Sequence, residues 1–185
     1  MCAILKTSEE ASKKGATLLM RKTIGYWFLW LLLPCCNQLW AQGQASNDIL
    51  AQKLVDELLA KHQAELLYLG LHLVPPNGTE SVIVAATLRD KIGKKSSSAD
   101  LHVLETEVPI LEMKGGGGTV IKGTVIGSTV LAPLHDRKGN IIGMVNIGMS
   151  FGAGRESEAA KFARSIEQEL AGEITMKLAL FERAR

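Results

Sequence analysis

The sequence predicts an α+β domain in which an antiparallel sheet of about five strands is flanked by an N-terminal and a C-terminal helix. Amphipathic helical patterns lie over 47–67 and 156–181. The segments between them are rich in β-branched residues and are joined by compact turns. A run of antiparallel strands with helices at both ends is typical of the α+β class.

The first 41 residues are expected to be a secretory signal peptide. The basic pair Arg21-Lys22 precedes the apolar run 25–33, which is too short to cross a bilayer because a span needs roughly 20 apolar residues. A polar end with the small residue Ala41 completes the pattern of a cleavable signal. Met20 opens a complete signal by itself, so residues 1–19 are either an upstream start or a long leader. Cleavage after Ala41 is favoured over lipidation of Cys36, and we expect a periplasmic or secreted domain over 42–185.

Removing residues 1–41 also removes the basic excess. They hold five of the 21 Lys and Arg residues and two of the 19 Asp and Glu residues. The remaining 16 basic and 17 acidic residues give a net charge of about −1, so charge gives no reason to expect nucleic-acid binding. All three cysteines lie before residue 42, which excludes disulfides, thiolate catalysis and cysteine-ligated metals from the mature domain.

The mature domain begins with a helix over 47–67, in which leucines recur every four residues from Leu50 to Leu58. A strand is expected at 67–74, followed by a Pro-Pro-Asn-Gly turn. The apolar, β-branched segment 81–88 is expected to be the second strand of this hairpin.

The middle of the chain begins with a polar connection, 89–100, which leads into a short helical turn at 101–106. A brief strand is expected at 108–113, before four consecutive glycines that are typical of a loop tip. Segments 119–134 and 141–151 are expected to be strands joined by an Asp-Arg-Lys-Gly-Asn hairpin turn.

The last expected element is an amphipathic helix over 156–181. Its apolar residues recur every four positions: Phe162, Ile166, Leu170, Ile174 and Leu178. Charged residues occupy the other face, so we expect the apolar stripe to pack on the sheet or on the first helix.

Two strings within the mature chain carry a more specific pattern. One is IVAATLRDKIGKKSSSADLHVLETEVPILE over 83–112, and the other is VLAPLHDRKGNIIGMVNIGMSF over 130–151. They resemble the pocket-lining connection and the closing hairpin of the single Cache domains, which are PAS-like extracytoplasmic sensor modules. The resemblance implies a PAS/Cache-like sheet whose concave face binds a small molecule. The chain departs from the family pattern because it ends at Arg185 without a membrane helix and signalling domain, and because it lacks the aromatic and acidic constellation of the amino-acid-binding subfamily.

Strand alternation and loop position select six candidate ligand-binding residues: Tyr68, Thr87, Arg89, Lys91, His102 and Asn146. Thr87 and Arg89 share a face if the strand extends that far, and a guanidinium binds a carboxylate bidentately. We therefore expect Arg89 to bind an anionic ligand. Asn146 interrupts an apolar strand, and a buried amide needs a partner, which is either another strand or the ligand.

The sequence favours binding over catalysis. Its four histidines, of which His102 is the best candidate for the pocket, have no metal-ligand spacing. His72 or His102 offers an axial ligand for haem, but no other feature indicates haem. The serines lack a nucleophile-elbow motif. We therefore expect no metal, no cofactor and no enzymatic activity.

We expect an exported, free-standing Cache-like domain that binds a small organic anion for sensing or sequestration. The alternative is a profilin- or roadblock-like interaction module that forms a homodimer or docks a membrane receptor through its helices, and an enzyme on the same fold is the third. A ligand domain needs a cavity lined by Arg89 or His102, and an interaction module needs a filled sheet face and an exposed apolar helix stripe. An enzyme needs strongly perturbed titrating groups in a cleft.

Overall fold

The computed structural model of the chain describes residues 48–114 and 119–184. The expected signal peptide over 1–41, with Met20 and Cys36, lies outside the described residues, so its cleavage stays a prediction. Within the described part of the chain, no helix is long and apolar enough to cross a membrane.

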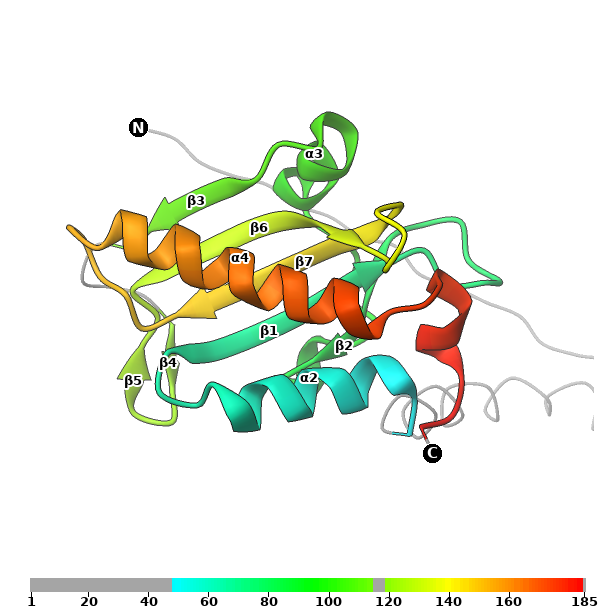
Figure 1. The fold of residues 1–185 in the computed structure, drawn as a ribbon, viewed down its shortest axis with the longest axis horizontal. Coiled ribbons are helices and arrows are strands. Elements are labelled where there is room, and N and C mark those ends of the chain that lie inside the picture. Colours follow the sequence, from blue (N-terminus) through cyan, green and yellow to red (C-terminus); the bar gives the residue numbers. More distant parts are fainter. Residues whose placement is uncertain (1–47, 115–118, 185) are drawn as a thin grey trace, which may run out of the picture. The chain divides into compact units, whose positions relative to one another are not determined.

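Five antiparallel strands form one sheet in the spatial order β2-β1-β7-β6-β3 (Figure 1). In chain order these strands are β1 (Leu66–Leu73), β2 (Val82–Ala86), β3 (Ile110–Met113), β6 (Ser128–His135) and β7 (Ile141–Met149). The pairs β1–β2 and β6–β7 are the two expected hairpins, and β1 joins them by pairing with β7. This arrangement confirms the predicted α+β class and its five-stranded antiparallel sheet.

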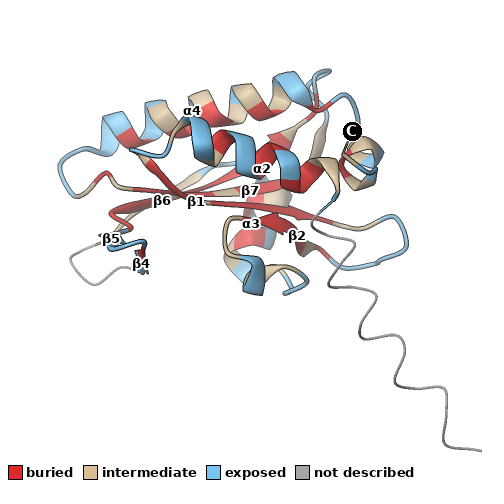
Figure 2. Cartoon of the chain, turned by 90° about the horizontal axis from the view of Figure 1, so that it is seen from below, coloured by how far each residue is buried: buried red, intermediate tan, exposed pale blue. Residues whose placement is uncertain are grey.

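Two helices, α2 (Leu50–Lys61) and α4 (Glu156–Glu173), cover the same face of this sheet (Figure 2). Each buries residues three or four positions apart, because such residues lie on one side of a helix. The buried apolar residues are Ala51, Leu54, Val55 and Leu58 in α2, and Ala159, Ala163, Ile166 and Leu170 in α4. They form the main core with alternate residues of the central strands, among them Leu69 and Leu71 of β1 and Val145 and Ile147 of β7.

Short elements lie against the opposite face of the sheet (Figure 2). They are the helix α3 (Ser98–Thr106) and a hairpin of β4 (Val120–Ile121) and β5 (Thr124–Val125). A 3-10 turn, η1 (Arg89–Lys91), follows β2 in the chain. A capping box starts α3: the Ser97 hydroxyl accepts from the Asp100 backbone N–H, and the Asp100 carboxylate accepts from the Ser97 N–H at 2.7 Å. The cap holds the Asp100 side chain in a buried position at the start of α3.

The closing helix is shorter than the sequence predicts because the β6–β7 turn binds its end. The Arg137 guanidinium donates to the Gly172 carbonyl at 2.8 Å, and the Arg137 backbone N–H donates to the Ile174 carbonyl at 2.7 Å. The chain then forms a separate 3-10 turn η2 (Lys177–Phe181), which leaves Leu178 57% exposed rather than buried in the helical stripe.

Candidate functional site

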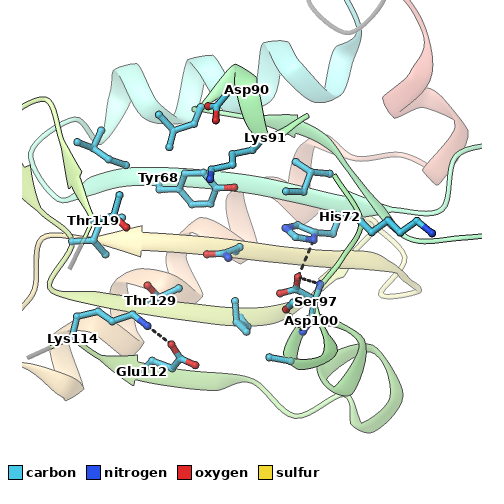
Figure 3. Close-up of a pocket in the computed structure, with 18 residues that line it drawn as sticks. Tyr68, His72, Asp90, Lys91, Ser97, Asp100, Glu112, Lys114, Thr119 and Thr129 are labelled. Atoms are coloured by element: carbon cyan, nitrogen blue, oxygen red, sulfur yellow. Dashed lines mark hydrogen bonds and ion pairs between the residues drawn. The ribbon is translucent and has the colours of Figure 1, made fainter. Parts of the chain in front are cut away.

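A cavity of about 580 Å³ lies on the sheet face opposite α2 and α4 (Figure 3). Its floor comes from the central strands, and its rim comes from η1, the start of α3, the end of β3 and the β4–β5 region. Its apolar lining includes Ile83, Leu88, Ile121, Ile126 and Leu131. This volume is typical of a site for a small organic ligand.

Alternation along neighbouring strands brings Tyr68 and His72 of β1 and Asn146 of β7 to the cavity floor. Gly70 lies between the two β1 residues and opposite Asn146 in the register. A Cβ atom at Gly70 would lie 2.6 Å from the Tyr68 hydroxyl oxygen, so the glycine leaves room for the phenol over the sheet. Burial, followed by the nearby Asp100 and Asp90 carboxylates, raises the pKa of Tyr68 to about 12, so the phenol stays neutral.

His72 is the most buried polar side chain of the floor, at 3% exposure. Its Nδ1 atom lies 3.0 Å from the Ser96 hydroxyl oxygen and 3.4 Å from Asp100 Oδ2. Its Nε2 atom is buried and has no hydrogen-bond partner among the described residues. Burial lowers the pKa of His72 although Asp100 opposes the shift, so the ring is neutral at neutral pH.

Most charged side chains at the rim pair with one another. Lys114 pairs with Glu112, and Lys95 pairs with Glu80 at 2.6 Å. Lys91 lines the cavity, and its side chain forms no hydrogen bond or ion pair with any described residue. Figure 3 shows its side chain extending toward Tyr68. Among the described residues at the rim, Lys91 is therefore the cation that is free to bind a ligand anion.

Three of the six residues selected from the sequence, Tyr68, Lys91 and Asn146, line the cavity, whereas the other three do not. The Thr87 hydroxyl accepts from the Leu69 backbone N–H at 3.0 Å and donates to the Leu69 carbonyl at 3.3 Å. It therefore closes the end of the first hairpin. His102 lies on an exposed position of α3.

Arg89 does not face the cavity, contrary to the sequence prediction. Strand β2 ends at Ala86, whose backbone N–H and C=O bind the Gln52 side chain of α2 at 3.1 and 3.3 Å. The alternation that would align residue 89 with Thr87 stops there. The Arg89 guanidinium instead donates to both carboxylate oxygens of Asp56 on α2, at 2.9 and 2.7 Å.

The six residues selected from the sequence do not include two buried residues of this site, His72, which was considered only as a haem ligand, and Asp100. His72 follows Tyr68 by four positions, so the alternation that selected Tyr68 also selects His72. The pattern Ser97-x-x-Asp100 is typical of a helix start and predicts the position of Asp100 on its own helix. The approach of Asp100 to His72 depends on how α3 packs, which no local pattern reports.

The cavity floor offers a phenol, an imidazole and a carboxamide, and the described part of its rim offers one unpaired ammonium group. Within the described residues, no group of three or more His, Cys, Asp or Glu side chains is arranged to hold a metal ion. Polar groups placed sparsely between apolar walls suit the non-covalent binding of a small molecule. Tyr68 and His72 are also titrating groups with shifted pKa values in a cleft, which is a feature of enzymes, so the expected lack of activity stays a prediction.

No protein-family model matches the chain, and no curated protein matches it. Among solved structures, a type II free methionine-R-sulfoxide reductase from Thermoplasma acidophilum is 16% identical, with coverage of 78% of this chain and 97% of that one and a TM-score of 0.44. The GAF domain of A. aeolicus nlh2 in an inactive state is 12% identical, with coverage of 77% and 91% and a TM-score of 0.48. The GAF domain of a two-component sensor histidine kinase from Bacillus halodurans is 10% identical, with coverage of 69% and 91% and a TM-score of 0.44. None of these three is a Cache domain, and with TM-scores below 0.5 they support no inference about function.

Proposed function

We propose that the domain binds a small organic anion in the cavity on the open face of its sheet, for sensing or sequestration. The observation that carries this proposal is the Lys91 ammonium, which has no partner among the described residues and lies at the rim of a cavity of about 580 Å³ with apolar walls. A cation beside apolar surface gains most from an anionic partner, because charge-assisted hydrogen bonds are about twice as strong as neutral ones. The likeness of two sequence strings to Cache domains supports the same role.

The interaction-module alternative receives less support. It requires a filled sheet face and an apolar stripe left exposed on a long helix. The sheet face instead carries the cavity, and the helix stripes, represented by Leu54 of α2 and by Ile166 and Leu170 of α4, are buried in the core.

The test has two stages. A thermal-shift screen of the purified protein against amino acids, carboxylates, purines and haem identifies the ligand class, because binding at a hundred times the Kd adds about 2.7 kcal/mol to stability. Calorimetry then measures the affinity of the best-binding acid for the wild type, for Lys91→Met and for Lys94→Met. Lys94 is the matched control, since it lies in the same loop, 3.7 Å from Asp90.

We expect Lys91→Met to weaken binding roughly 10- to 100-fold, the range for losing a hydrogen bond to a charged group. Lys94→Met should leave the affinity unchanged. Equal affinity in wild type and Lys91→Met would contradict the anion assignment. Binding of an uncharged purine, with no binding by any acid, would contradict it as well.

We also propose that the domain acts outside the cytoplasm after removal of residues 1–41. The support is the basic pair, the short apolar run and Ala41. N-terminal sequencing of the protein recovered from the extracytoplasmic fraction should find a start near Gln42. A start at residue 1 or Met20 would contradict cleavage, and a lipid-modified start at Cys36 would contradict the proposed cleavage position.

A further inference from the structure

We propose that the ligand carries an N–H hydrogen-bond donor in addition to its acidic group, and that this donor binds Nε2 of His72 on the cavity floor. This inference rests on the proposed function, because it concerns the same cavity and the same anion. Its starting point is the His72 side chain, which is 97% buried, lines the cavity, and has an Nε2 atom without a partner among the described residues. A buried polar atom that stays unpaired costs about 1–3 kcal/mol, so such an atom in a binding cavity indicates a group that the ligand satisfies.

The surroundings of the other ring nitrogen indicate that Nε2 is an acceptor. Nδ1 faces the Ser96 hydroxyl oxygen at 3.0 Å and Asp100 Oδ2 at 3.4 Å. The Ser96 hydroxyl donates its own proton to the Ser81 hydroxyl oxygen at 2.8 Å, so its oxygen is available to accept from Nδ1. The carboxylate of Asp100 also accepts. A proton on Nδ1 satisfies both neighbours, and a neutral imidazole with a proton on Nδ1 has a lone pair on Nε2.

Asn146 provides a second unsatisfied group beside His72. His72 lies opposite Met144 in the β1–β7 register, which makes Asn146 its diagonal neighbour on the same face. Diagonal neighbours of this kind are about 7–8 Å apart, a separation that one small molecule spans. The Asn146 Oδ1 atom is buried, and the side-chain amide of Asn146 forms no hydrogen bond with any described residue.

The remaining lining restricts the ligand further. Ile83 and Leu131 provide apolar surface at the floor, and Ile121 and Ile126 provide it at the wall. Lys91 lies at the rim, so the acidic group and the N–H donor are held at different parts of the cavity. These features together fit a largely apolar acid with an N–H group, such as a heteroaromatic carboxylate.

The experiment uses pairs of acids that have the same shape and differ only in the donor. Indole-3-acetate is compared with benzofuran-3-acetate, and pyrrole-2-carboxylate with furan-2-carboxylate, by calorimetry on the full chain. A ring oxygen in place of N–H faces the Nε2 lone pair without a proton, so we expect the N–H member to bind at least about tenfold more tightly. The preference should disappear in His72→Phe, with circular dichroism to confirm that the variant folds.

A measurement on wild type keeps the test independent of how that variant folds. The imidazole ¹⁵N resonances of His72 report which nitrogen carries the proton, and the Nε2 resonance should shift when an N–H acid binds. A protonated Nε2 in the free protein, or equal affinities within both pairs, would overturn the donor assignment and leave the anion proposal standing. If no acid of either pair binds, the donor assignment is overturned. The anion proposal is decided separately, by the affinities of wild type and Lys91→Met for the best-binding acid of the thermal-shift screen.

Discussion

Truncation of Ile166 to alanine tests whether the stripe on α4 is core or an exposed interaction surface. Ile166 is fully buried and belongs to the cluster that joins α4 to the central strands. The substitution removes three buried carbon atoms, which contribute about 0.8 kcal/mol each. The cavity left behind adds to this loss, so we expect the free energy of unfolding to fall by about 3–4 kcal/mol, within the range of about 2–5 kcal/mol for such truncations.

Urea unfolding followed by circular dichroism measures this change, provided that the m-value stays constant. Leu178→Ala is the matched control, because the four-residue repeat assigns Leu178 to the same stripe whereas the structure leaves it 57% exposed. We expect the control to change stability by less than about 0.5 kcal/mol. A loss below about 0.5 kcal/mol for Ile166→Ala would refute the burial argument and favour an interaction surface. An equal loss at Leu178 would indicate that the helix continues to 181.

Three further predictions concern stability. Gly143→Ala places a Cβ atom 2.4 Å from the His72 carbonyl oxygen and should destabilise by at least about 1–3 kcal/mol. A Cβ atom at Gly172 in α4 meets no atom within 4 Å, so Gly172→Ala should stabilise by about 0.5–1 kcal/mol in the same urea assay. A Gly143→Ala variant that is more stable than Gly172→Ala would contradict the close approach at Gly143. The lowered pKa of His72 means that the folded state takes up this proton at lower pH than the unfolded chain, whose histidines titrate near pH 6.5. The free energy of unfolding should therefore decline as pH falls below about 6.5, and it should decline more steeply in wild type than in His72→Phe. Equal slopes in the two proteins would show that His72 is not buried as a neutral ring.

Local patterns predicted most of the elements because side-chain periodicity is set by backbone geometry alone. The two hairpins, the turn between β6 and β7, and the amphipathic α2 and α4 all follow from spacing and turn chemistry. The same local patterns did not predict where the helices end. The four-residue repeat continues past Glu173, but Arg137 binds the carbonyls at the end of α4 and redirects the chain.

The sequence by itself determined the α+β class and the presence of Tyr68 and Asn146 on one sheet face, because alternation along a strand needs no information from elsewhere in the chain. Only the tertiary structure decided which cation faces the cavity. Strand β2 ends where Gln52 of α2 binds the Ala86 backbone, and Arg89 then pairs with Asp56 of α2. The Lys91 side chain in the same turn has no partner in the described part of the chain. Contacts between residues more than thirty positions apart set this choice, and neither periodicity nor composition encodes which distant side chains meet.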